Sequence, residues 1–272
     1  MIDIHSHILA EVDDGPKSWD VAREMCRLAK EDGVECMIAT PHANERYHYD
    51  REYLIRALAH LRQLVGPEPR LGLGCDFHLS YENIQAALAT PSRFTIESTN
   101  YLLVELSNFS VPPQISDSLM KLGDKGLIPI LTHPERNPIL QKSLKRVLEW
   151  VEIGVVVQVT ASALTGFWGE PVRRSAHWLL EHDAVHVLAS DAHDPEHRKP
   201  GLSEARGIVS EMRGHEVAHA LVDGNPRARS IYLCTLYTHK KHWKGGHGSP
   251  RRHKKRSHTR AHALTTTYTV PR

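Results

Sequence analysis

The chain has 272 residues, 40% of them hydrophobic and 24% charged, which is typical of a globular protein and of one large domain. No stretch approaches the roughly 18 apolar residues of a membrane span, and the N-terminus lacks the basic flank and apolar run of a signal peptide. Residues 239–272 hold 10 of the 34 Lys/Arg and no Asp/Glu, so residues 1–238 keep 24 basic against 32 acidic residues, a net charge of −8 that argues against nucleic acid as the substrate.

Cysteine is scarce and histidine is abundant. The four cysteines (Cys26, Cys36, Cys75 and Cys234) form no CxxC pair, which suits a reducing compartment, and we expect a cytoplasmic protein. None of them begins the Cys-x5-Arg signature of thiol-based phosphatases, so that mechanism is absent. There are 20 His against 8 Tyr and 4 Phe. The sequence does not indicate an oligomeric state.

Short apolar runs rich in Val and Ile predict buried strands of a parallel sheet. There are seven: Ile2–His5, Val34–Ala39, Leu71–Gly74, Leu102–Leu106, Leu127–Leu131, Val155–Val159 and Val185–Leu188. Helical patterns lie between most of them. One begins after Ser18, which can cap it, and ends at Gly33, and two others precede Gly154 and the seventh run. This alternation predicts an α/β fold whose sheet is either open or closed into a barrel.

The C-terminal segment differs in composition. Residues 239–272 consist mainly of Lys, Arg, His, Gly, Ser and Thr, which bury too little apolar surface to offset the entropy of ordering. We predict one domain over residues 1–238 and a disordered basic tail over 239–272. A solvated extension is favoured over contact with nucleic acid or anionic lipid.

Six of the seven predicted strands carry His, Asp or Glu at or just after their C-terminal ends. In chain order these are His5 and His7, with Asp14 in the first loop, then His42, Asp76, Glu105, His133, and Asp191 with His193. A barrel places functional groups after nearly every strand, whereas an open sheet gathers them at one switch point. The pattern therefore favours a barrel with a site at its C-terminal end.

Imidazole and carboxylate together suit Zn²⁺, Mn²⁺ or Fe²⁺. Nine candidate ligands are too many for one tetrahedral ion and predict two or three ions that share carboxylates. Singly, each residue has another explanation: Glu105 could pair with a buried base, and Asp191 could cap a helix. One metal cluster explains all the strand ends together, so we prefer it.

The motifs also resemble a known superfamily. Met-Ile-Asp-Ile-His-Ser-His-Ile-Leu at 1–9 and Val-Asp-Asp-Gly-Pro-Lys-Ser at 12–18 resemble the start of polymerase-and-histidinol-phosphatase (PHP) domains. Leu-Thr-His-Pro-Glu-Arg and Leu-Ala-Ser-Asp-Ala-His agree in order and spacing. Over roughly residues 1–233 the chain looks closest to the bacterial manganese-dependent protein-tyrosine phosphatases of capsule and exopolysaccharide operons. The resemblance implies a distorted (β/α)7 barrel of PHP type, two or three metal ions, Mn²⁺ before Fe or Zn, and a phosphotyrosine polypeptide as substrate, the tail of a bacterial tyrosine kinase.

Carried over by motif position, the resemblance distributes the ligands over three ions. It implies His5, His7, Asp76 and Asp191 for the first, Asp76, Glu105 and His133 for the second, and Asp14, His42 and His193 for the third. The family usually has Glu where this chain has Asp76, which makes the bridging role of Asp76 the weakest of these assignments.

The implied chemistry is hydrolysis by a metal-bridged hydroxide. Arg136 and Arg198 match phosphate-binding arginines of the family, and a planar guanidinium suits bidentate contact with phosphate. The alternative is that each arginine pairs with a surface carboxylate.

Three other functions are alternatives to a protein-tyrosine phosphatase. A small-molecule phosphatase, such as a histidinol-phosphate phosphatase, would share the metal site, and a non-enzymatic kinase-binding regulator would keep the metals for structure. His215-Glu216-Val217-Ala218-His219 fits the HExxH pattern of zinc proteases, but Val222 stands where the metzincin extension needs Gly. We therefore expect this segment to be a surface helix.

Overall fold

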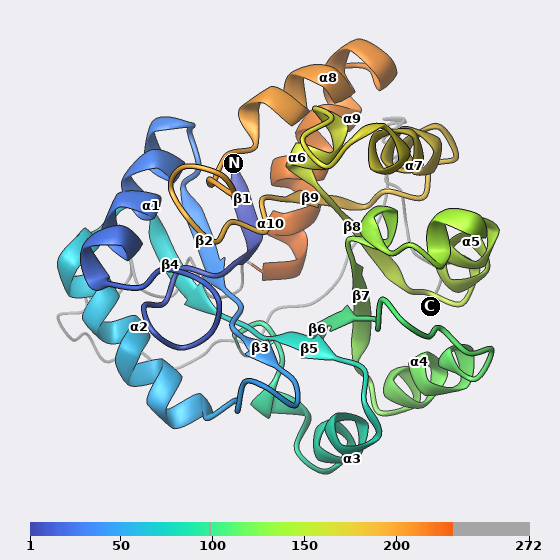
Figure 1. The fold of residues 1–272 in the computed structure, drawn as a ribbon, viewed down its shortest axis with the longest axis horizontal. Helices are drawn as coiled ribbons and strands as arrows, with labels where there is room; N and C mark the ends of the chain where they lie inside the picture. The colour runs from blue at the N-terminus through green and yellow to red at the C-terminus, as the bar shows by residue number, and fades with distance from the viewer. Residues whose placement is uncertain (98, 231–272) are drawn as a thin grey trace, which may run out of the picture.

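Strands and helices alternate along the chain in the computed structural model, which describes residues 1–97 and 99–230 (Figure 1). The strands are β1 Ile2–Ser6, β2 Cys36–Ala39, β3 His42–Ala43, β4 Arg70–Leu73, β5 Asp76–His78, β6 Tyr101–Glu105, β7 Ile128–Thr132, β8 Val156–Thr160 and β9 Val187–Ala189. The α-helices are α1 Trp19–Glu31, α2 Arg51–Val65, α3 Tyr81–Ala89, α4 Ile115–Asp124, α5 Lys145–Glu152, α6 Ala161–Leu164, α7 Glu170–Glu181, α8 Ser203–Arg213, α9 His215–His219 and α10 Asn225–Ser230. The predicted tail, its boundary at 238 and Cys234 lie outside the described residues.

The strands form two parallel sheets that together make seven strand positions. One sheet has the order β1-β2-β4 and the other the order β3-β5-β6-β7-β8-β9. The strand at the second position is interrupted between β2 and β3, and its neighbour is interrupted between β4 and β5. Backbone hydrogen bonds cross this seam, from Gly74 N to Ala39 O (2.8 Å) and from Asp76 N to Pro41 O (3.1 Å).

The first and last strands also meet. A parallel bridge joins Ser6 to Ala192, and hydrogen bonds run from His7 N to Ala192 O (2.8 Å) and from Asp191 N to His5 O (2.9 Å). Individual hydrogen bonds, rather than a full ladder, thus connect the sheets at both seams. The predicted distorted seven-stranded α/β barrel is confirmed, and helices surround its strands (Figure 1).

Buried apolar side chains form two clusters. The larger one lies between the strands and the surrounding helices. The smaller one fills the barrel interior and combines Ile96, from the loop before β6, with residues from strands of both sheets: Ile2, Ile4, Cys36, Ile38, Leu103, Ile130, Val156, Val187 and Ala189. Gly72 leaves room for this packing, because a Cβ there would lie 2.6 Å from Ile38 Cδ1.

The helices follow local signals in the sequence. Ser18 caps α1, accepting a hydrogen bond from Val21 N (3.3 Å), as its position before an amphipathic segment predicts. The helices expected before Gly154 and before the last strand are α5 and α7. Within the described part of the chain, no helix is long and apolar enough to cross a membrane.

Candidate metal centre

The predicted ligands lie toward the C-terminal ends of the seven strand positions: His42 and Asp76 begin the short strands β3 and β5, and Asp14 lies in the loop between β1 and α1. β1 ends beside His5 and His7, and β3, β5 and β6 carry His42, Asp76 and Glu105. Of the nine side chains, His5, His7, Asp76, Asp191 and His193 are buried, His42, Glu105 and His133 are partly buried, and Asp14 is exposed. Parallel strands of one barrel end at the same face, so residues far apart in the sequence meet there.

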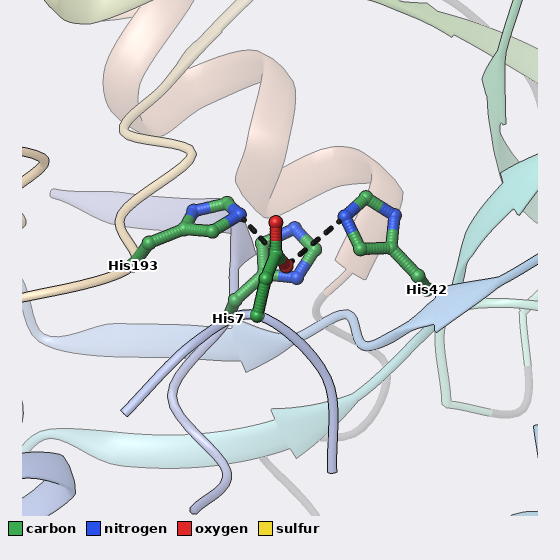
Figure 2. Close-up of side chains that lie close together, drawn as sticks. His7, His42 and His193 are labelled. Atoms are coloured by element: carbon green, nitrogen blue, oxygen red, sulfur yellow. Dashed lines mark ion pairs between the residues drawn. The ribbon is translucent and has the colours of Figure 1, made fainter. Parts of the chain in front are cut away.

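The first group of possible ligands is His7, Asp14, His42 and His193. Asp14 Oδ1 lies 3.3 Å from both His42 Nε2 and His193 Nε2. Figure 2 shows His42 and His193 pointing toward each other from either side of His7. The group combines three imidazoles with one carboxylate, a set that borderline divalent ions favour.

Two further groups share Asp76. One consists of His5, His7 and Asp76, and the other of His42, Asp76 and Glu105. Asp76 Oδ2 lies 3.6 Å from His5 Nε2 and 3.1 Å from His42 Nδ1. His133 belongs to none of the three groups, and its Nε2 is 3.9 Å from Glu105 Oε1.

The shorter of these distances, 3.1 Å from Asp76 to His42 and 3.3 Å from Asp14 to His42 and His193, fit shared ions. Two ligands that are each about 2.1 Å from one ion lie about 3.0–3.4 Å apart at octahedral or tetrahedral angles. Both buried oxygens of Asp76 accept no hydrogen bond from the part of the chain that the structure describes. A buried carboxylate without donors requires a compensating positive charge, and a divalent cation would supply it.

The electrostatics point the same way. Burial alone would lower the pKa of His42, but the carboxylates of Asp14 and Asp76 beside its ring raise it to about 11. Burial also opposes protonation of His7, whose pKa is raised to about 9 by Asp13. The pKa of His133 falls to about 3, because the ring is buried and Arg136 is close. Protons and cations therefore compete for His7 and His42, whereas the ring of His133 is already neutral at pH 7.

Residues behind the ligands orient the imidazoles. Asp13 Oδ2 lies 2.7 Å from His7 Nδ1 and accepts from His42 N (3.2 Å), while its Oδ1 accepts from Gly15 N (2.9 Å). Gln158 Oε1 lies 3.0 Å from His5 Nδ1. With Nδ1 engaged in this way, each ring turns Nε2 toward the cluster. Sequence reasoning did not single out Asp13 or Gln158, although a polar Gln within an apolar run was an available signal.

Two of the nine residues have left-handed backbones. His133 has φ 35° and Asp191 has φ 51°, a conformation that costs non-glycine residues about 1–2 kcal/mol. Both follow the end of a strand, β7 or β9, where the chain turns sharply. Strain of this kind gathers at functional sites, because the surrounding structure must hold it in place.

The two oxygens of Asp191 face different partners. Its Oδ1 lies 3.4 Å from the Nε2 atoms of both His5 and His7. Its Oδ2 accepts hydrogen bonds from Arg136 and from Arg198 Nη2 (2.7 Å). The arginines are therefore paired with a buried carboxylate of the site and not with a surface one.

Features outside the centre do not form a second site. His215 and His219 lie on α9 and are exposed, and no group of possible ligands among the described residues includes them. The surface helix predicted for this HExxH segment is thus confirmed. Cys26, Cys36 and Cys75 are buried, and burial raises the pKa of Cys26 to about 12 and holds that of Cys75 well above its ordinary value. A thiol nucleophile needs the opposite shift.

Known proteins resemble this chain in sequence and in fold. CpsB of Streptococcus pneumoniae, a tyrosine-protein phosphatase, is 29% identical over 236 residues, which cover 84% of this chain and 97% of that protein. YwqE of Bacillus subtilis, also a tyrosine-protein phosphatase, is 30% identical over 227 residues, covering 82% and 89%. A crystal structure from the pair of metal-dependent tyrosine phosphatases YwqE and CpsB matches with a TM-score of 0.78 at 30% identity, over 85% of this chain and 94% of that one.

More distant structures share the fold alone. The phosphotriesterase homology protein of Escherichia coli aligns with a TM-score of 0.55 at 11% identity.

The family model described as Capsular polysaccharide synthesis, CpsB/CapC, matches residues 1–230. The expected kinship with phosphatases of capsule operons is thereby confirmed, and the chain belongs to the CpsB/CapC family.

Proposed function

We propose that this protein is a metal-dependent protein-tyrosine phosphatase. One observation carries the proposal: seven imidazole and carboxylate side chains form groups that could hold metal ions, His133 and Asp191 lie beside them, and two arginines bind Asp191. Relatives of about 30% identity are named tyrosine-protein phosphatases. Phosphoryl transfer needs positive charge around the phosphoryl oxygens, and cations together with arginines provide it.

The ligand groups suggest how the ions would be held. We infer two or three divalent ions on His5, His7, Asp14, His42, Asp76, Glu105, His133, Asp191 and His193, with Mn²⁺ preferred and Fe or Zn as alternatives. When bound, the ions would neutralise phosphoryl oxygens and lower the pKa of a water molecule. The chain's own residues supply orientation, since Asp13 and Gln158 hold the rings of His7 and His5.

Arg136 and Arg198 would bind the phosphoryl oxygens. Their side chains are 20% and 24% exposed, so a phosphate entering from solvent can reach them. The buried Arg198 Nε donates to no acceptor among the described residues. Asp191 holds both guanidinium groups beside the ligand cluster, which leaves other N–H donors for the substrate.

The substrate we propose is phosphotyrosine in a flexible polypeptide, the tail of a bacterial tyrosine kinase of polysaccharide synthesis in the cytoplasm. The family's link to capsular polysaccharide synthesis supports this partner. The exposed Asp14 supports access by a protruding chain, because its side chain, 43% exposed, lies at the open edge of the cluster.

Metal dependence is tested by chelation and by thiol alkylation on the same preparation. We expect a chelator to abolish hydrolysis of a phosphotyrosine peptide and Mn²⁺ to restore it, because the candidate ligands bind through oxygen and nitrogen. Alkylation should leave most of the activity, since Cys26, Cys36 and Cys75 are buried. Loss of activity on alkylation while the metal content stays constant would refute the mechanism.

Substrate class is tested by comparing kcat/KM for a phosphotyrosine peptide and for histidinol phosphate. We expect clear preference for the peptide, because a phenolate with a pKa of about 10 is a better leaving group than an alkoxide. Efficient turnover of histidinol phosphate beside an inert peptide would assign a small-molecule phosphatase. Peptide binding without turnover of either compound, in metal-loaded protein, would assign a regulator.

A further inference from the structure

Gly166, Phe167, Trp168 and Gly169 form a tight turn between α6 and α7. Gly169 N donates to Gly166 O (2.9 Å), and both glycines have positive φ values, 89° and 87°. Side chains rarely adopt such values, so glycine suits both ends of this turn. The turn exposes the Phe167 side chain and leaves Trp168 partly buried against the core.

Trp168 contacts both arginines of the metal centre. The Cζ atom of Arg136 lies 4.0 Å from the centroid of the indole ring, and that of Arg198 lies 5.4 Å from it. The indole Nε1 donates to Ser162 Oγ (2.9 Å), which fixes the orientation of the ring. Trp168 is neither one of the predicted metal ligands nor part of the family motifs in the sequence.

We propose that Trp168 is a positioning residue that holds Arg136 and Arg198 together as one anion-binding fork at the metal centre. The inference rests on the proposed phosphatase function and adds a residue that touches neither phosphate nor metal. The fork would bind a phosphoryl group, because each guanidinium group has several N–H donors for the oxygens of such an anion and Asp191 Oδ2 occupies only some of them.

The physical basis is mutual repulsion. Arg136 and Arg198 carry like charges and share one carboxylate oxygen, Asp191 Oδ2. Arg198 Nη2 also donates to the backbone oxygen of Asp191 (3.3 Å), but among the described residues both long side chains depend on Asp191 alone for their hydrogen bonds. The indole face attracts both cations through its quadrupole, which is strongest for tryptophan among the aromatic residues. The ring therefore lowers the cost of keeping both groups in place before phosphate arrives.

The test compares Trp168→Leu, Trp168→Phe and Phe167→Ala. Leucine removes the aromatic face. Phenylalanine keeps an aromatic face that attracts cations more weakly, and it lacks the N–H that donates to Ser162. Phe167→Ala removes the neighbouring exposed ring, whose centroid lies 5.2 Å from that of Trp168 in an edge-on contact, while the cation–ring contacts of both arginines are with Trp168. Each variant is measured for kcat, KM, metal content, and affinity for inorganic phosphate by calorimetry.

We expect Trp168→Leu to lower kcat and the affinity for phosphate by about tenfold, as for loss of a desolvated cation–ring contact, with unchanged metal content. The kcat and phosphate affinity of Trp168→Phe should lie between those of Trp168→Leu and the wild type. Those of Phe167→Ala should equal the wild-type values. Because Trp168 acts through the arginines, its effect should largely disappear in an Arg136→Gln, Arg198→Gln background, which has no cation over the ring.

Three outcomes would overturn the proposal: normal phosphate affinity and kcat in both Trp168 variants, loss of metal in Trp168→Leu, or additive effects with the arginine substitutions. If Trp168→Leu does not fold, wild-type kcat and phosphate affinity in Trp168→Phe are enough to overturn the proposal. Phosphate binding does not depend on the substrate, so failure of this inference remains distinguishable from a wrong choice between phosphotyrosine and another phosphate ester.

Discussion

Arg136 and His133 come from one short turn after β7 but have different chemistry. Pro134–Arg136 is a single 3-10 turn, and His133 lies at its start with a left-handed backbone. This geometry sends the ring of His133 toward Glu105 and the guanidinium of Arg136 toward Asp191. At the scale of residues, substitutions at the two positions should therefore affect turnover and metal content differently.

We predict that Arg136→Lys lowers turnover of a phosphotyrosine peptide by on the order of 10², the loss typical of one preorganised donor. Lysine keeps the charge but loses the planar fork. Metal content should remain at the wild-type level, whereas His133→Ala should lose both metal and activity. Steady-state kinetics and metal analysis check this. Normal turnover in Arg136→Lys, or metal loss equal to that of His133→Ala, would contradict the assignment.

Asp76 shows how register can compensate for a short side chain. It pairs directly with His42 across β5 and β3, and β6 follows on its other side. Its Oδ2 therefore lies 3.6 Å from His5 Nε2 and 3.1 Å from His42 Nδ1, although the resemblance implied a longer Glu at this position. The bridging role of Asp76 between two ions remains a proposal that this placement supports.

At the scale of elements, the loop after β1 depends on close backbone packing. A Cβ on Gly15 would lie 2.6 Å from the carbonyl oxygen of His7, and the N–H of Gly15 is held by Asp13. Asp13 in turn contacts His7 and the backbone of His42. A shift of this loop must therefore move several groups of the metal centre together.

We predict that Gly15→Ala weakens metal affinity by about 10–100-fold, as loss of an outer-shell contact does, and destabilises the fold by about 1–3 kcal/mol. The matched control is Gly207→Ala on the exposed face of α8, where nothing lies within 4 Å of the added carbon. That change should stabilise the protein by about 1 kcal/mol, because alanine favours helix. Metal titration measures the change in affinity, and thermal unfolding measures the change in stability. Normal metal affinity in Gly15→Ala would contradict the prediction.

At the scale of the whole molecule, the family match ends at residue 230, and the basic segment from His239 lies beyond the described residues. We predict that truncation after Thr238 leaves the Tm and kcat nearly unchanged, because the composition of 239–272 offers little apolar surface for packing. Unfolding and turnover of full-length and truncated chains check this. A large fall in either quantity would mean that the segment docks on the domain.

Local pattern predicted much of this fold. Each of the seven apolar runs coincides with an observed strand position, because buried parallel strands need continuous Val and Ile. The interruptions that separate β3 from β2 and β5 from β4 were not predicted. They fall at Thr40–Pro41, where proline has no N–H to donate, and at Gly74–Cys75 on the neighbouring strand.

The sequence by itself determined which face of the barrel carries the site, since strand direction places His5, His42, Asp76 and Glu105 at the C-terminal ends whatever the details of packing. Only the tertiary structure decided which side chains share a group. It placed His133 outside the three groups, divided Asp191 between imidazoles and arginines, and brought Trp168 under both guanidinium groups. Those contacts join residues far apart in the chain, and they depend on side-chain directions that no local spacing encodes.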